Sequence, residues 1–200
     1  MGGYGSLNIA MRHPDVFSAV YSMSPGLFNE DGLWESQMYG EFAVRKFMDE
    51  QVEVLAKPQD EQLLGVLTMV DFFTAAYGRA FAYNVNNPPF YFDYPYTESG
   101  GELVRDDTIW KRWESGFGGI ADEVPQYKDN FLALKGIVVD YGIRDELLWI
   151  PRGCVYFDEQ LTAAGIPHEM IPYDGTHMSK LAERVREHML PYFSELLVGE

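Results

Sequence analysis

The sequence predicts an α/β fold in which a short parallel sheet is covered by helices on both faces, together with a mostly helical insertion. Two observations predict it. Short continuous apolar runs alternate with helix-like stretches near both ends of the chain, and the middle of the chain contains no convincing parallel strand. With 200 residues, 46% of them apolar and 15% aromatic, the chain can bury a sizeable core. We therefore expect one domain over residues 1–200, with residues 28–130 as a cap or insertion.

The first 26 residues read as a helix followed by a buried strand. Gly5 to Met11 suits a helix, which His13-Pro14 closes because the residue before a proline is pushed out of the α region. The run "FSAVYSMSP" is apolar and ends in the turn residues Ser24-Pro25-Gly26, a pattern typical of a buried strand. A helix followed by a buried strand is half of a βαβ unit.

The middle of the chain changes character. Helical stretches at Phe42 to Leu55 and Glu61 to Tyr77 alternate with loops, and "NNPPFYFDYPY" is rich in proline and aromatic residues. About a hundred residues without core sheet are typical of a cap, a lid or another insertion. Within it, Phe90, Tyr91 and Tyr94 are candidate substrate-binding residues that could form an aromatic wall for an acyl or aryl group. The alternative is that these rings pack the cap onto the sheet, since aromatic side chains dominate core contacts.

The alternation of strands and helices returns near Lys135. Gly136 to Asp140 reads as a buried strand, "CVYFDEQLTAAG" as a helix stopped by Gly165, and His168 to Tyr173 as another strand. The last helix, Ser179 to Leu197, has an apolar residue at every fourth position from Leu181 onward.

Charge and composition exclude several classes of function. The 15 Lys and Arg against 31 Asp and Glu give a net charge of −16, which argues against nucleic acid or an anionic membrane as the main partner. The longest uncharged run, Val16 to Asn29, is too short and too polar to span a bilayer. The single cysteine, Cys154, permits no intramolecular disulfide and no cysteine metal cluster; it reads as a small core residue, or as a thiol activated at a helix start. We expect no metal and no cofactor.

Two residues that suit acid–base chemistry follow two of the predicted strands. Asp145 comes shortly after Gly136–Asp140, and His177 lies between the strand ending at Tyr173 and the last helix. Reactive groups of open α/β sheets lie in loops beyond the carboxyl ends of strands, and an acid followed by a histidine is the order used by α/β-hydrolases. The alternatives are a helix N-cap for Asp145 and a surface turn for His177, and Asp140 competes for the role of the acid.

Several motifs resemble the esterase D-like branch of the α/β-hydrolase superfamily, which includes S-formylglutathione hydrolases, feruloyl esterases and mycolyltransferases. They are "MGGYGSLNIAMRHPDVFSAVYSMSP", "NPPFYFDYP", "GIVVDYGIRDE" and "LTAAGIPHEMIPYDGTH". In that family a nucleophilic serine precedes such an opening, as G-x-S-M-G-G. The resemblance implies a serine-type carboxylic ester hydrolase that acts through an acyl-enzyme on a small-molecule ester, with Asp145 and His177 as triad members.

The same resemblance implies that Met1 directly follows the nucleophile, so that its backbone nitrogen would be one oxyanion-hole donor. The nucleophile and the strands expected before it are not in this sequence. We therefore expect an incomplete domain that starts at an internal methionine, through either a misplaced start or a truncated gene, and that is inactive by itself. Ser6 is a poor substitute nucleophile, because it lies inside the helix and not on the strained turn that exposes the family's serine.

Two other functions stay open from the sequence. The chain could be a non-catalytic fragment or binding module whose acidic, aromatic surface contacts a partner. It could also belong to an acyltransferase, since the same acyl-enzyme serves transfer to an alcohol. The strand around Ser18–Ser24 would also leave an apolar edge unpaired, which predicts homo-oligomerisation or aggregation through that edge.

Overall fold

A computed structural model describes residues 1–29, 32–36 and 38–197. The chain divides into two compact units: Met1–Gly32 together with Phe117–Glu200, and Leu33–Gly116. The first unit contains the sheet predicted from the sequence. The cap or insertion predicted over 28–130 stays a prediction, and the second unit is described below by itself.

A parallel three-stranded sheet forms the centre of the first unit, in the order β1-β4-β5. Its strands are β1 (Ala19–Met23), β4 (Gly136–Gly142) and β5 (Glu169–Tyr173). Met23 pairs with Asp140 and Gly142 with Tyr173, so the carboxyl ends of all three strands meet at one edge. The predicted α/β fold with a parallel sheet is confirmed.

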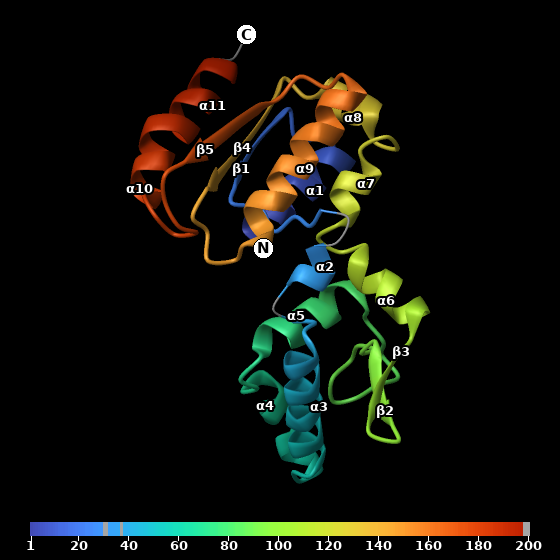
Figure 1. The fold of residues 1–200 in the computed structure, drawn as a ribbon. Helices are drawn as coiled ribbons and strands as arrows, with labels where there is room; N and C mark the ends of the chain where they lie inside the picture. Colours follow the sequence, from blue (N-terminus) through green and yellow to red (C-terminus); the bar gives the residue numbers. More distant parts are fainter. Residues whose placement is uncertain (30–31, 37, 198–200) are drawn as a thin grey trace. The chain divides into compact units, whose positions relative to one another are not determined.

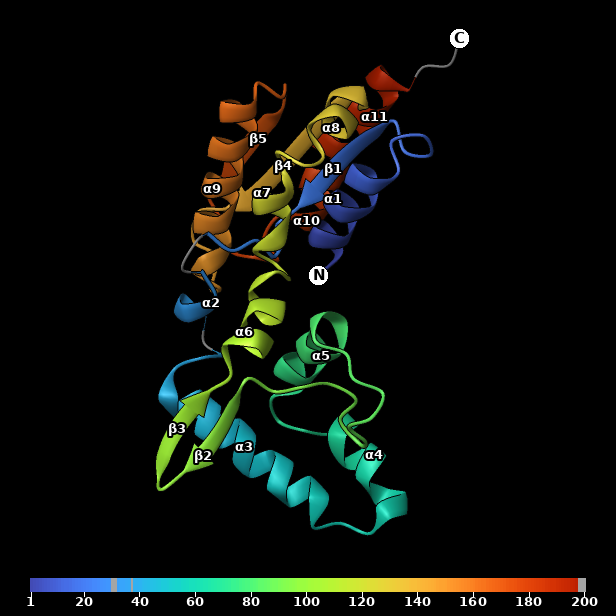
Figure 2. The same ribbon diagram turned by 90° about the vertical axis from the view of Figure 1, so that its right-hand side faces the viewer.

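Helices cover both faces of this sheet (Figure 1). Helices α10 and α11 lie on one face, with the π-helix η1 between them. The other face carries α1, α7, α8 and α9, and Figure 2 looks onto that side. The bounds are α1 Gly2–Arg12, α7 Gly119–Glu123, α8 Lys128–Ala133, α9 Trp149–Ala164, α10 Leu181–Arg184, η1 Val185–Met189 and α11 Leu190–Leu196. Burial on both faces explains why β4 reads as a continuous apolar run.

The last helix differs from the expected uniform helix over Ser179–Leu197. It begins at Leu181 and contains the π-helical turn Val185–Met189. An apolar residue at every fourth position drifts by about 40° per step around an ideal α-helix. A wider π turn reduces that drift, and Val185, Met189 and Phe193 are each partly buried.

The start of α1 lies against the carboxyl end of β1. A Cβ on Gly3 would come 2.5 Å from the carbonyl oxygen of Met23, and the Ser22 hydroxyl donates to the Gly3 carbonyl at 2.8 Å. Leu7 and Met11 of the same helix are fully buried. Residues 1–3 therefore lie at the edge where the three strands end.

Helix α9 packs directly on the backbone of Leu27 at Gly153, and a substitution there is a test of this packing. A Cβ there would come 1.9 Å from the carbonyl oxygen of Leu27, a backbone atom that cannot move aside alone. We expect Gly153→Ala to lower the free energy of unfolding by about 3 kcal/mol, as overpacking does. Urea unfolding measures it, with Gly5→Ala as control, since nothing lies within 4 Å of a Cβ on that helical glycine. Equal urea midpoints for Gly153→Ala and wild type would show that α9 is not seated on Leu27.

The second unit packs helices and a hairpin around aromatic side chains. Trp113 is fully buried and stacks on Tyr77, with ring centroids 5.4 Å apart. The elements are α3 Glu41–Leu55, α4 Gln59–Leu67, α5 Phe72–Phe81, β2 Tyr96–Ser99, β3 Glu102–Arg105 and α6 Asp107–Glu114, while α2 Gly32–Glu35 begins at the division between the units.

Two features of the second unit differ from the expectation. The helix expected over Glu61–Tyr77 is two helices, because Asp71 caps the second one by accepting from the Thr74 N–H at 3.0 Å. The antiparallel hairpin β2–β3 is a second difference, because the sequence predicts no strand in this part of the chain. Its turn carries Gly100 and Gly101 at φ of 62° and 85°, which only glycine adopts readily.

None of the helices in the described part of the chain is both long and apolar enough to cross a membrane.

Candidate active site

Asp145 and His177 form a hydrogen-bonded pair at the carboxyl edge of the sheet. His177 Nδ1 and Asp145 Oδ2 are 2.7 Å apart, although 32 residues separate them in the sequence. The loops after β4 and β5 approach closely because Gly142 has no side chain; a Cβ there would come 2.5 Å from the Gly175 carbonyl oxygen. The backbone N–H of Arg144 donates to that carbonyl at 3.0 Å and joins the two loops.

The two side chains differ in exposure. The Asp145 side chain is fully buried, whereas 31% of the His177 side chain is exposed. Asp145 accepts the Leu147 N–H at 2.9 Å on its other oxygen, so it bonds the following turn and the histidine at the same time. A carboxylate at Nδ1 makes that nitrogen the N–H donor and leaves Nε2 free to take a proton.

Glu146 is a second carboxylate of this site, and no motif in the sequence selects it. Its Oε2 accepts the backbone N–H of His177 at 3.1 Å. Hydrogen bonds from its own backbone N–H and from that of His177 lower the pKa of the Glu146 carboxyl below its ordinary value of 4.5. Its position directly after Asp145 is the only sequence signal that could have found it.

The pKa of Glu146 is lower in the folded chain than in the unfolded chain. Its bond to the His177 loop therefore stabilises the fold fully at pH values above the ordinary glutamate pKa. That contribution is lost as the pH falls through the lowered folded pKa. We expect the Glu146 Cδ resonance to titrate with a midpoint below 4.5 in ¹³C NMR. Glu146→Gln identifies the resonance by its loss, and a midpoint above 4.5 in the wild-type chain contradicts the contact with His177.

Asp140, the competing candidate for the acid, faces other partners. It forms a buried ion pair with Arg184 and accepts the Tyr21 hydroxyl at 3.0 Å. Burial, followed by the charge of Asp140, raises the pKa of Tyr21. The described contacts of His177 therefore include Asp145 and not Asp140.

Met1 and Ser6 lie at the start of α1, at this same edge. The Met1 carbonyl accepts the Gly5 N–H at 2.9 Å, and 55% of Met1 is exposed. The Ser6 hydroxyl donates to the Gly3 carbonyl at 2.8 Å, within its own helix. The role of Met1 as an oxyanion-hole donor stays a prediction.

The three aromatic candidates lie in the second unit. Phe90 is buried with 4% exposure, and the ring of Tyr94 packs on Phe47 with centroids 4.8 Å apart. Tyr91 has a left-handed φ of 60° and lines a pocket of about 380 Å³ with Pro88 and Pro89. Substrate binding by these residues stays a prediction.

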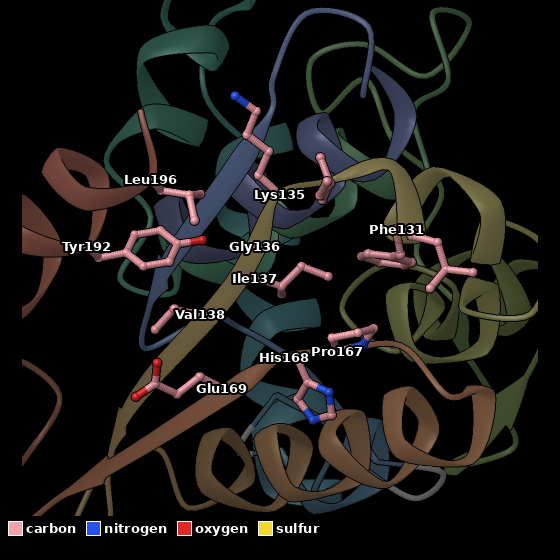
Figure 3. A pocket seen from close by; sticks show the side chains of 12 residues that line it. Phe131, Lys135, Gly136, Ile137, Val138, Pro167, His168, Glu169, Tyr192 and Leu196 are labelled. Atoms are coloured by element: carbon pink, nitrogen blue, oxygen red, sulfur yellow. The ribbon is translucent and has the colours of Figure 1, made fainter. Parts of the chain in front are cut away.

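A further pocket of the first unit lies at the opposite edge of the sheet (Figure 3). It has a volume of about 330 Å³ and is lined by residues that include Gly136, His168, Glu169 and Tyr192. Gly136 and Glu169 begin β4 and β5, so this pocket lies at the amino ends of the strands. It is therefore separate from the Asp145–His177 pair, which follows the carboxyl ends.

Cys154 is fully buried in α9, and burial raises the pKa of its thiol well above the ordinary value. A thiol of this kind is a poor nucleophile, which favours the core interpretation over activation at a helix start. Within residues 1–29, 32–36 and 38–197, no group of three or more His, Cys, Asp or Glu side chains is arranged to hold a metal ion.

Comparison with known proteins gives a family match and a fold match. A family model described as "Putative esterase" matches residues 1–119. A solved ferulic acid esterase aligns with 98% of this chain at a TM-score of 0.52 and 16% identity. A thioesterase domain from a curacin biosynthetic pathway aligns with all of this chain and 64% of its own, at a TM-score of 0.37 and 13% identity. No curated protein matches the chain.

The match to the ferulic acid esterase shows an α/β-hydrolase-like fold. The chain spans about half the length of that protein, covering 49% of it.

Proposed function

Because this chain belongs to the Esterase family, whose members are esterase-type hydrolases, we propose that it carries the catalytic acid and base of a serine-type carboxylic ester hydrolase. The observation that carries the proposal is the 2.7 Å contact between Asp145 and His177 at the carboxyl edge of the sheet. Reactive groups of α/β folds gather at that edge.

The geometry supports a separate role for each member of the pair. Partly exposed His177 would take the proton of a serine through Nε2 and return it to the leaving alcohol. Buried Asp145 would hold the imidazole in the tautomer with the proton on Nδ1 and stabilise the imidazolium that forms.

The proposal assigns the nucleophile to a serine directly before Met1, outside these 200 residues. The motif resemblance supports this position, and so does the place of residues 1–3 beside the end of β1, at the edge where the pair lies. With the serine in place, the backbone N–H of Met1 would be one donor to the oxyanion. The 200-residue chain alone would then have an acid and a base but no group for them to activate.

The substrate is a small-molecule carboxylic ester. The serine attacks its carbonyl carbon, the alcohol leaves with the proton from His177, and water then releases the acid from the acyl-enzyme. Transfer of the acyl group to a second alcohol would use the same intermediate, so the two activities differ only in the acceptor.

The acyl-enzyme can be tested directly by intact-protein mass spectrometry. A protein that extends upstream through the G-x-S motif is mixed with p-nitrophenyl acetate and quenched in acid. We expect a single acetyl adduct on the serine before Met1, and its decay gives hydrolysis or, with an added alcohol, transfer. Release of p-nitrophenol without any adduct, and without any acetyl ester of an added alcohol, would count against the acyl-enzyme mechanism. The absence of both adduct and product would favour a non-catalytic binding module.

A further inference from the structure

A buried ion pair lies beside the Asp145–His177 site and takes no part in the proposed chemistry. Arg184 of α10 and Asp140 of β4 have side-chain exposures of 4% and 1%. They make two contacts: Arg184 Nη2 bonds Asp140 Oδ1, and Arg184 Nε donates to Oδ2 at 3.1 Å.

Such a pair is weak evidence for stability, because removing two charges from water opposes their attraction. The remaining donors of Arg184 indicate what the pair does instead. Nη1 lies 3.4 Å from the Ser179 carbonyl oxygen and 3.5 Å from that of His177, and Nη2 donates to the Ser24 hydroxyl at 3.2 Å. One guanidinium therefore reaches from the end of β1 to the loop that carries His177.

Tyr173 connects the same guanidinium to that loop by a second route. The Arg184 guanidinium lies over the Tyr173 ring, 4.3 Å from its centroid, a cation–π contact. The Tyr173 hydroxyl donates to the Thr176 carbonyl at 2.9 Å and lies 3.4 Å from the His177 carbonyl. The carbonyl of His177 is thus contacted by the Arg184 guanidinium and by the hydroxyl of Tyr173, the ring on which that guanidinium lies.

We propose that Arg184, oriented by its ion pair with Asp140, is a positioning residue. It holds the His177 loop in the place where the imidazole forms its hydrogen bond with Asp145. A displacement of about 1 Å in a reacting group can reduce a rate about a hundredfold, which gives a reason to fix this loop. The functional meaning rests on the proposed role of His177 as the base, but the positioning itself is a property of the folded chain.

The test therefore uses a signal that requires no hydrolysis. An imidazole N–H that donates to a buried carboxylate gives a low-field proton resonance, which ¹H NMR detects in the 200-residue chain. Asp145→Asn removes the acceptor charge and identifies the resonance by its loss. The test variant is Asp140→Asn with Arg184→Met, which removes both buried charges together and keeps an acceptor for Tyr21. The matched control is Arg186→Met, an arginine on the same helical segment whose side chain is 73% exposed.

We expect the low-field resonance to be lost in the double variant and unchanged in Arg186→Met, while the other amide signals show a retained fold. Should the double variant not fold, Arg184→Lys gives the same comparison. Lysine keeps the charge beside Asp140 but cannot also reach the two loop carbonyls, so the resonance should broaden or disappear.

Persistence of the resonance in a folded double variant or in Arg184→Lys would overturn the proposal, as would its absence from the wild-type chain. If the mass-spectrometric experiment gives neither adduct nor product, the proposed ester hydrolase activity is contradicted, but the NMR comparison is unaffected. The two claims can therefore fail separately.

Discussion

His177→Ala is expected to reduce ester hydrolysis on the order of 10⁶-fold in kcat, in a protein that includes the serine before Met1. Without the imidazole no group takes the serine proton, and the leaving alcohol receives none. The assay is release of p-nitrophenol under saturating substrate. KM should change little, because the imidazole acts on the reacting proton more than on ground-state binding.

His188→Ala is the matched control for this substitution. His188 is exposed on η1 and belongs to neither of the loops that follow β4 and β5, so its removal should leave kcat unchanged. An equal loss of kcat in both variants would indicate a general effect on folding. An unchanged kcat in His177→Ala would show that His177 is not the catalytic base.

Asp145→Asn is expected to lower kcat about 10⁴-fold while leaving the fold intact. The amide is nearly the same size as the carboxylate and can still accept the Leu147 N–H. It does not provide the charge that stabilises the imidazolium, and it can hold the histidine in the wrong tautomer. Comparison of kcat at several pH values measures the loss.

Asp174→Asn is the control for charge. Asp174 lies in the same loop as His177, but its side chain is 69% exposed and pairs with Arg144 at the surface. It should therefore change kcat by much less than tenfold, since exposed ion pairs contribute little. A similar loss in both variants would mean that general negative charge near His177, and not the buried contact at Nδ1, supports the reaction.

The sheet and the place of Asp145 and His177 at its carboxyl edge could be predicted from the sequence for the same physical reason. Strands buried on both faces are continuous apolar runs, as in Ile137–Val139, and the loops that follow them are where reactive side chains gather. Asp145 and His177 were therefore identifiable without any knowledge of their 2.7 Å contact.

The other polar contacts around Asp145 and His177 could not be predicted, because tertiary packing determines which residues meet there. Arg184 and Asp140 lie 44 residues apart, and in the sequence Arg184 is one more charge on an amphipathic helix. Glu146 reads as a surface carboxylate until the loop after β5 brings the His177 N–H to it. The split between α4 and α5 depends on a single capping residue, Asp71, within an otherwise helical pattern.

Hydrolysis of p-nitrophenyl acetate by two purified proteins tests most directly whether Asp145 and His177 serve a serine outside these 200 residues. One protein is the 200-residue chain and the other extends upstream through the G-x-S motif, each with and without His177→Ala. We predict that only the longer protein turns over and that His177→Ala abolishes its activity. Hydrolysis by the 200-residue chain that depends on His177 would contradict this assignment, and Ser6 would then be the first residue to substitute.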